Sequence, residues 1–223
     1  KIKKLTNKLI EEINEEKPNI IVITGDLIDS EDTKESLDLI TIIKNIAPIY
    51  YVTGNHEAEI QNIYNEFEQK LKENGVNVLR NEVANIEHLD SKITIIGIDS
   101  PEFMASSSIL NECEIIFKRK LEELTENLNT FTILLSHRPD FFEEYINRNI
   151  DLTLSGHTHG GQVRVPIIGA LYAPNQGLFP ELDKGIYEKN KKYMIISGGI
   201  GTTGLPLRTF NKPELVVVEL KTK

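Results

Sequence analysis

The chain has 223 residues, of which 39% are hydrophobic and 26% charged, a composition typical of globular proteins rather than disordered or fibrous ones. A single core usually stops growing at about 250–300 residues, so we expect one domain over residues 1–223. The net charge of −9 argues against a nucleic-acid partner, because phosphate backbones attract basic surfaces. The single cysteine, Cys113, excludes an internal disulfide, and no apolar stretch reaches the ~18–20 residues of a membrane span.

The first half of the chain alternates predicted helices with short buried strands. Apolar residues at three- and four-residue steps predict helices over residues 2–13, 37–44 and 58–74, which end before Pro18, Pro48 and Gly75. Runs rich in β-branched residues predict strands at 19–24, 49–52 and 76–79. Strands that are apolar on both faces are typical of a parallel sheet.

The second half continues this alternation and then changes in character. We expect strands at 92–98, 131–135 and 152–154, with helices over 113–128 and 141–148. After Gly156, glycine and proline become frequent, and strands at 193–196 and 215–220 close the chain. Helices and strands in this order predict an α/β layered fold with a mixed sheet or two stacked sheets.

Polar side chains follow four of the predicted strands, at the point where each strand ends. The four segments are Gly25-Asp26, Gly54-Asn55-His56-Glu57, Ser136-His137 and Gly156-His157-Thr158-His159. The carboxyl ends of strands in an open α/β sheet share one edge, where ligands bind. We therefore expect these side chains to converge, although they are far apart in the sequence.

The histidine count indicates which ligand this edge would bind. Four of the five histidines lie in these segments. Neutral imidazole is the commonest transition-metal ligand, and Asp and Asn oxygens complete a site suited to Mn, Fe or Zn. A single Asp or His after a strand is usually a turn residue or a helix cap, and that reading is the favoured one for Asp26 taken alone. The whole set at matching strand ends predicts a metal site.

Together, the four segments resemble the calcineurin-like metallophosphoesterase family. The order and spacing of the motifs match over essentially the whole chain. The longer blocks from Ser155 to Gln162 and from Leu171 to Leu178 resemble one bacterial, often membrane-associated subgroup, the YaeI-type phosphohydrolases. Some relatives in that subgroup cleave the pyrophosphate of UDP-diacylglucosamine, and others are phosphodiesterases.

This resemblance implies a four-layer α/β/β/α sandwich with mixed sheets and a two-metal centre at the strand ends. The implied ions are Mn, Fe, Zn or Co, with manganese favoured. The resemblance implies that Asp26 bridges the two metals. It gives the second metal Asn55, His137 and His157, and the first metal His159. His56 would be a catalytic residue, stabilising the phosphoryl oxygens or protonating the leaving group, and Asp29 matches the acidic residue that orients it.

One family motif has no counterpart in the sequence. The family's first motif, Asp-x-His, lies on a strand upstream of the first helix, and no Asp-x-His occurs in the 223 residues. Either the sequence begins after that strand, or the protein is a one-metal or inactive variant. We favour the first explanation, because the second metal keeps four protein ligands and His56 is present. The domain over residues 1–223 would then lack its first strand.

We therefore expect a metal-dependent hydrolase that cleaves a phosphodiester or pyrophosphate bond by attack of a metal-bound hydroxide. The alternative is a truncated or degenerate protein that binds one metal without hydrolysis. The substrate would be a phosphorylated small molecule or a lipid-linked phosphate. Its candidate contacts are Arg164, Arg208 and Asn175. The alternative for each arginine is a surface or structural role, and Asn175 reads first as a turn residue. We expect a cytoplasmic location, or membrane association through a segment outside this chain, and leave peripheral membrane contact and the oligomeric state open.

Overall fold

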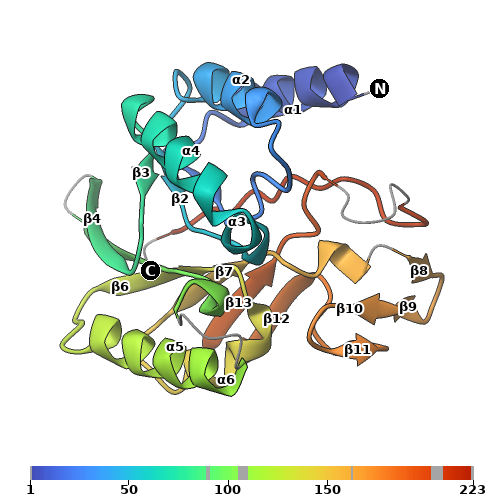
Figure 1. Cartoon of the computed structure of the whole chain (residues 1–223). Helices are drawn as coiled ribbons and strands as arrows, with labels where there is room; N and C mark the ends of the chain where they lie inside the picture. Colours follow the sequence, from blue (N-terminus) through green and yellow to red (C-terminus); the bar gives the residue numbers. More distant parts are fainter. Residues whose placement is uncertain (1, 89–90, 105–109, 162, 202–207, 222–223) are drawn as a thin grey trace.

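The computed structural model describes residues 2–88, 91–104, 110–161, 163–201 and 208–221. Two β-sheets lie face to face, and helices cover the outer face of each (Figure 1). The four-layer α/β/β/α sandwich implied by the sequence motifs is confirmed.

The first half of the chain forms one sheet and its helices. Strands β1 (Ile21–Ile23), β2 (Ile49–Tyr51) and β3 (Asn77–Val78) pair in parallel in the order β1-β2-β3. Helices α1 (Ile2–Glu16), α2 (Lys34–Ile43) and α4 (Gln61–Glu73) bury apolar side chains against this sheet, including Ile40, Tyr64 and Phe67. The short helix α3 (Asn55–Glu59) follows β2 directly.

The second half forms a six-stranded mixed sheet in the order β12-β13-β7-β6-β5-β4. The strands are β4 (Glu82–His88), β5 (Ser91–Ile98), β6 (Phe131–Ser136), β7 (Leu152–Ser155), β12 (Gly185–Lys189) and β13 (Lys192–Ile196). The outer strands β4 and β12 are antiparallel to their neighbours, whereas β5, β6, β7 and β13 run parallel. Helices α5 (Leu110–Thr125) and α6 (Phe142–Ile146) pack on its outer face.

A third apolar cluster joins the two sheets. Val52 and Leu79, which follow β2 and β3, pack against Ile95, Ile133 and Leu135 of the six-stranded sheet. The two sheets therefore bury each other's inner faces, and the burial of apolar surface holds their strand ends in a fixed relation. None of the described helices is both long and apolar enough to cross a membrane.

Two small hairpins lie beside this sandwich. Strands β8 (Arg164–Val165) and β9 (Gly169–Ala170) form one, and β10 (Tyr172–Ala173) and β11 (Gly177–Leu178) form the other. Both extend to one side of the molecule (Figure 1). Their position matters because β10 and β11 are joined by a turn that contains Asn175.

The predicted elements differ from the structure in three respects. The helix over 58–74 is divided into α3 and α4 at Ile60, whose backbone leaves the helical region. Strands β4 and β12 were not predicted, because their polar residues hide the alternating pattern of an edge strand. Strands β8, β9, β10 and β11 were not predicted either, because each is two residues long. Residues 215–220 form no strand, because no described segment pairs with them. Several of their apolar side chains are exposed.

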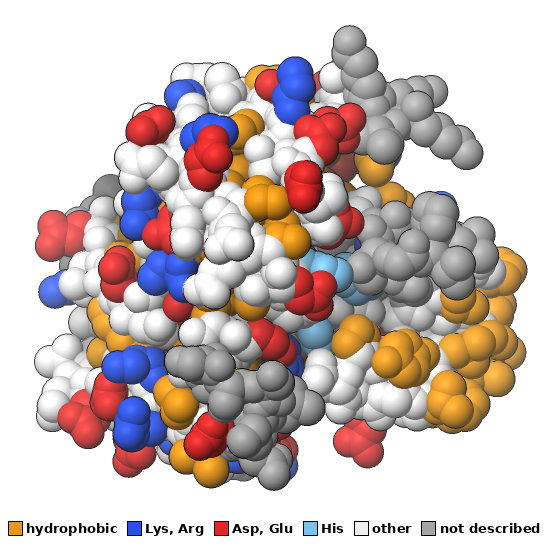
Figure 2. Space-filling view, in the orientation of Figure 1, with side chains coloured by type: hydrophobic (Ala, Val, Ile, Leu, Met, Phe, Trp, Pro, Cys, Tyr) orange, Lys and Arg blue, Asp and Glu red, His pale blue; other side chains and the backbone are white. Residues whose placement is uncertain are grey.

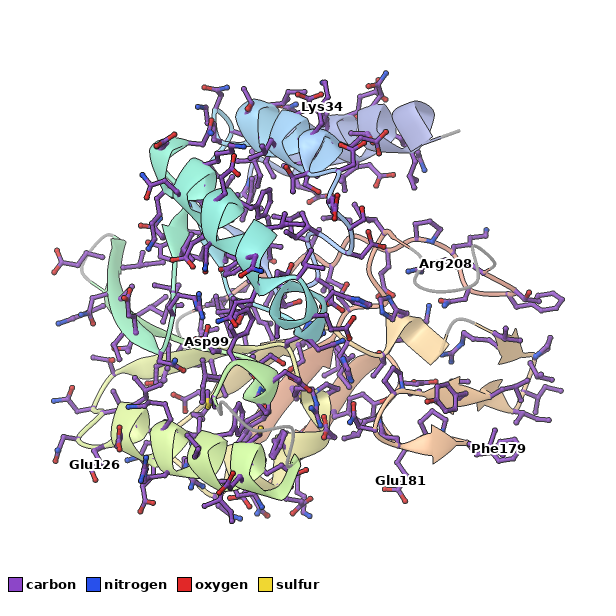
Figure 3. All side chains as sticks on the ribbon, in the orientation of Figure 1. Lys34, Asp99, Glu126, Phe179, Glu181 and Arg208 are labelled. Carbon is purple, nitrogen blue, oxygen red and sulfur yellow. The ribbon has the colours of Figure 1, made fainter. Side chains whose placement is uncertain are left out.

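A buried polar network ties the first sheet to the second. The Thr53 hydroxyl, two residues after β2, donates to Asp99 Oδ1 (2.9 Å), which follows β5. Arg80 Nε donates to the same oxygen (2.5 Å), and its guanidinium lies 4.5 Å from the centre of the Phe103 ring. Asp99 lies between the helical layer and the six-stranded sheet in Figure 3. The network therefore fixes the turn that begins at Thr53, where Asn55 and His56 follow.

We predict that Arg80→Met lowers the free energy of unfolding by about 3 kcal/mol, because it leaves the buried Asp99 carboxylate without its cation. Lys72→Met is the matched control. Arg80 and Lys72 both pair with Glu68, but Lys72 lies at the surface, so its loss should cost less than about 1 kcal/mol. Urea denaturation measures both. Equal losses from the two substitutions would contradict a structural role for the buried network.

Candidate metal centre

The four polar segments predicted from the sequence do meet at one edge of the sandwich. Asp26 follows β1, Asn55 begins α3 after β2, His137 follows β6, and His157 lies just after β7. Figure 2 shows histidine atoms at the surface between the helical part of the molecule and the region of the small hairpins. The strand order thus brings together residues that lie more than 100 positions apart.

One group of ligand atoms is compact and buried. Nε2 of His137 lies 3.1 Å from Oδ2 of Asp26, 3.2 Å from Oδ1 of Asn55 and 3.1 Å from Nδ1 of His157. Nδ1 of His157 is in turn 2.9 Å from Oδ1 of Asn55. The ligand atoms of Asp26, His137 and His157 all lie within 4.8 Å of one another. This spacing allows one cation to contact all of them.

Backbone and side-chain acceptors determine which nitrogen of each ring faces the centre. Nδ1 of His137 is 2.7 Å from the carbonyl oxygen of Thr24, which can only accept, so Nδ1 carries the proton and Nε2 presents its lone pair in the neutral ring. Nε2 of His157 lies 2.6 Å from Oδ1 of Asn175. If that nitrogen donates a hydrogen bond, Nδ1 of His157 presents its lone pair toward Nε2 of His137.

The Asp26 carboxylate supplies the test of whether a metal fits. Its Oδ1 accepts the backbone N–H of His56 (3.1 Å). Its Oδ2 is buried and has no hydrogen-bond donor among the described residues when His137 is neutral. A buried anionic oxygen that faces two imidazole lone pairs and an amide oxygen is costly without a cation. The donor set of this group therefore fits a divalent transition metal.

A second, more open group shares Asp26. The ligand atoms of Asp26, His56 and His159 also lie within 4.8 Å of one another. Nε2 of His56 is 3.8 Å from Oδ2 of Asp26, and Nε2 of His159 is 4.0 Å from it. Asp26 thus lies between the two groups, where a carboxylate could bridge two ions.

Asp29 does not lie where its predicted role needs it. Its side chain is exposed, and it lies three positions after Asp26 in the chain. The carboxylates within 4 Å of the His56 ring nitrogens, among the described residues, belong to Asp26 and Glu59. Glu59 lies three positions after His56 on α3 and faces its Nδ1 at 3.8 Å. Among the described residues, Glu59 rather than Asp29 therefore has a carboxylate within 4 Å of Nδ1 of His56.

The pKa values reflect how closely these groups are packed. Burial raises the pKa of Asp26, but the neighbouring His137 and His56 rings outweigh it and hold the pKa well below its usual value. Burial lowers the pKa of His157 to about 4, with His137 adding to the effect. Burial likewise lowers the pKa of His159 to about 4. Both rings are therefore neutral at pH 7, which is the form that binds metals.

Two glycines allow the strand-end segments to touch. A Cβ on Gly25, whose φ is +89°, would lie 2.5 Å from the backbone nitrogen of Gly54. A Cβ on Gly54 would lie 2.1 Å from Oδ1 of Asp26. Asp26, His157 and His159 have φ values of +53°, +70° and +50°, a left-handed conformation that is uncommon outside glycine and concentrates at functional sites.

Glu57 is a polar residue at this site to which the sequence motifs assign no role. Its carboxylate is fully buried and accepts four backbone N–H groups: those of Gly54 (2.8 Å), Asp26 (3.0 Å), Leu27 (2.6 Å) and Ile28 (3.2 Å). It therefore holds the turn after β1 against the start of α3. Its position three residues after Gly54, at a helix start, is the spacing of a capping box, and this was the available signal.

Asn211 is a second residue at this site that no sequence motif indicates. It is buried, and its Nδ2 donates to the carbonyl oxygen of His159 (2.6 Å) across 52 positions. A contact of that sequence separation leaves no local pattern.

The three residues predicted to bind substrate each have another partner. Asn175 contacts His157, as described above.

Arg164 pairs with the carboxylate of Asp183 (2.6 Å) and donates to the carbonyl oxygen of Gly160. Arg208 donates to the carbonyl oxygens of Gly198 (2.6 Å) and Gly201 (2.7 Å), and it is close enough to help lower the pKa of His159. Their substrate contacts stay a prediction.

We predict that Glu57→Gln lowers the free energy of unfolding by about 3 kcal/mol, because a side-chain amide turns donors toward backbone N–H groups. The variant should also bind metal more weakly, since Asp26 and Asn55 lose their fixed relation. Glu59→Gln, on the exposed side of the same helix, is the control and should keep its stability. Urea denaturation and titration with Mn²⁺ measure the two effects. Unchanged stability in Glu57→Gln would contradict the role of this carboxylate.

We predict that Asn175→Gly weakens metal binding about 10–100-fold, because His157 loses the acceptor that fixes its tautomer. Glycine accommodates the φ of +61° at this position, so the backbone turn should survive. Asn175→Asp keeps the acceptor oxygen and should retain most of the affinity. Asn190→Gly makes the same change at another left-handed position, on the exposed turn after β12, and should have no effect. Equal affinity in all three variants would show that Asn175 does not position His157.

Comparisons with known proteins agree with this arrangement. The sequence model of the calcineurin-like phosphoesterase domain matches residues 3–161. The chain is 33% identical over 216 residues to the uncharacterised metallophosphoesterase YkuE of Bacillus subtilis. The aligned region covers 94% of this chain and 70% of that protein. It is 27% identical over 210 residues to the phosphodiesterase YaeI of Escherichia coli, covering 92% of this chain and 72% of that protein.

Solved structures show the same fold. The NAD nucleotidase of Haemophilus influenzae superposes with a TM-score of 0.51 over 91% of this chain and 44% of that one, at 19% sequence identity. The family match spans all four strand-end segments up to His159. Membership implies metal-dependent hydrolysis of phosphate esters, and the chain belongs to the calcineurin-like phosphoesterase family.

Proposed function

We propose that the protein hydrolyses a phosphodiester or pyrophosphate bond at a centre that holds two divalent metal ions, with manganese the favoured ion. The observation that carries the proposal is the position of Asp26 in both groups of ligand atoms. Asn55, His137 and His157 would complete one site, and His159 would contribute to the other. The similarity to a relative named as a phosphodiesterase supports this bond class.

The substrate we propose is a phosphorylated small molecule or a lipid-linked phosphate, and not a nucleic acid. The net charge of −9 disfavours a long polyanion, which would need an extended basic face. Two divalent ions would supply the positive charge that stabilises the phosphoryl oxygens and that makes water a better nucleophile. The side chains of the protein must then position the substrate and move a proton.

His56 is the residue we assign to the proton. Its side chain is 20% exposed and lies at the open side of the centre, so a substrate oxygen can approach it. The Glu59 carboxylate faces Nδ1 of the ring and would orient Nε2 toward the leaving group. A positioned acid of this kind typically contributes 10²–10⁴-fold to the rate.

An upstream strand would complete the more open metal group. β1 is at one edge of its sheet, and β2 is the strand that pairs with it in the described part of the chain. We infer that a strand carrying the Asp-x-His motif pairs with the free edge of β1 and adds its ligands beside Asp26 and His159. Without such a strand, the protein would bind one metal and would not hydrolyse phosphate esters.

We predict that His56→Ala lowers turnover about 10²–10⁴-fold on a diester with a poor, alkoxide leaving group. The loss should be smaller on bis-p-nitrophenyl phosphate, whose leaving group needs little protonation. Metal content, measured by elemental analysis, should stay unchanged in His56→Ala and should fall in Asp26→Ala. If His56→Ala loses one metal per chain, His56 is a ligand; if it keeps full rate on both esters, it is not the acid.

A further inference from the structure

One buried polar side chain beside the metal centre comes from the C-terminal segment of the chain. Asn211 is 3% exposed, although its neighbours Phe210 and Lys212 are both exposed. Its Nδ2 donates to the carbonyl oxygen of His159 (2.6 Å), and its Oδ1 is buried without a hydrogen-bond partner among the described residues. Burying an amide with one end unpaired costs free energy. We therefore expect its remaining hydrogen bond, the one to His159, to have a use.

The turn that carries His159 needs support from outside. His159, Gly160 and Gly161 have φ values of +50°, +61° and +77°, and His157 has a φ of +70°. The left-handed region is strained for residues other than glycine. Strained backbone persists only where its surroundings hold it in place. The hydrogen bond from Asn211 to the His159 carbonyl is a support of this kind, and it comes from 52 positions along the chain.

Gly160 allows the Asn211 amide to lie directly against this turn. A Cβ on Gly160 would be 2.8 Å from Oδ1 and 3.2 Å from Nδ2 of Asn211, and 3.1 Å from Cδ of Lys184. A larger residue at position 160 would therefore push the amide away from the His159 carbonyl. The contact thus depends on the glycine next to His159 as well as on Asn211.

The segment around Asn211 is itself attached on both sides. Before it, the backbone N–H of Arg164 donates to the carbonyl oxygen of Thr209 (2.9 Å). After it, the backbone N–H of Glu214 donates to the carbonyl oxygen of Gly199 (3.1 Å). Figure 1 shows this segment, drawn in red, passing the hairpin of β8 and β9. Because both flanks are attached to other loops, Asn211 can restrict the turn rather than move with it.

The contact with Asn211 concerns one of the two groups of candidate metal ligands. We call Asp26, His137 and His157 the compact group, and Asp26, His56 and His159 the open group. Nε2 of His159 lies 4.0 Å from Oδ2 of Asp26, so a small shift of the His159 backbone would take the ring out of reach of an ion in the open group. In the compact group, His157 contacts Asn175 instead.

We propose that Asn211 is a positioning residue for the open group. It holds the backbone of His159 where the ring can reach an ion beside Asp26, and it thereby sets the affinity of the open group for a divalent metal. The compact group binds its ion independently of Asn211. The presence of a metal in the open group rests on the proposed two-metal function, whereas the hold of Asn211 on the turn does not.

Hydrogen–deuterium exchange in EDTA tests the hold on the turn without any metal. Asn211→Ala removes the donor to the His159 carbonyl, so we expect peptides that cover residues 157–161 to exchange at least about tenfold faster. Peptides from β6 should keep their rates, which excludes a global loss of stability. Asn147→Ala is the matched control, because Asn147 Nδ2 also donates to a backbone carbonyl, that of Glu143 (2.8 Å), but at an exposed position after α6. It should leave residues 157–161 unchanged.

Calorimetric titration with Mn²⁺ tests the consequence for metal binding. We expect Asn211→Ala to weaken one of two bound ions at least about tenfold and to leave the other unchanged. Gly160→Ala, which places a Cβ against the Asn211 amide, should weaken the same ion. Asn175→Gly, which removes the contact of His157 in the compact group, should weaken the other ion. A merely structural role of Asn211 would not change one affinity alone.

Three results would overturn the proposal. Unchanged exchange of residues 157–161 in Asn211→Ala would show that Asn211 does not hold the turn. Two bound ions whose affinities both stay the same, or both fall together, would show that Asn211 does not act on the open group, while the two-metal function would stand. A parent protein that binds a single Mn²⁺ ion would contradict the two-metal function itself and, with it, the role of Asn211 in metal binding.

Discussion

The site depends on a cluster of metal-ligand atoms that face one another, among which Oδ2 of Asp26 has no hydrogen-bond donor in the described residues when His137 is neutral. Oδ2 of Asp26, Nε2 of His137 and Nδ1 of His157 converge within 4.8 Å, beside Oδ1 of Asn55. Carbonyl and amide oxygens at Thr24 and Asn175 fix the outer nitrogens of both rings, so the inner lone pairs cannot be satisfied by rotating a ring. Either a proton or a cation must occupy the centre. Burial lowers the pKa of His137, but the Asp26 carboxylate outweighs it and raises that pKa, so without a cation the proton lies on His137. The imidazole and carboxylate ligands fit a metal ion in its place.

The rest of the fold works to keep these acceptors together. Glu57 collects four backbone N–H groups from two segments, and the Thr53–Asp99 contact joins the same turn to the second sheet. Apolar packing between the sheets fixes the strand ends, and Gly25 and Gly54 remove the Cβ atoms that would separate them. Stability and metal binding are therefore coupled at this edge, since loss of the Glu57 or the Asp99 carboxylate would move the candidate metal ligands.

The sequence predicted the layered fold and the convergence of the histidines because both follow from short-range patterns. β-branched runs mark the buried strands, and the polar residues directly after them must meet at one sheet edge. The pattern could not find β4 or β12, whose polar residues resemble loops, nor the missing pairing of residues 215–220, because a strand exists only where a partner does. Contacts such as Asn211 with His159 and Asn175 with His157 depend on the tertiary fold, so no spacing in the sequence indicates them. The same reason explains why Glu59, rather than Asp29, lies beside His56.

The most direct test of the central claim is an anomalous difference map from crystals grown with Mn²⁺. We predict a peak within coordination distance of Oδ2 of Asp26, Nε2 of His137 and Nδ1 of His157, with a second peak on the His159 side of Asp26. A well-ordered centre without a peak between Asp26, His137 and His157 would contradict the account, and so would a manganese ion bound only elsewhere on the surface.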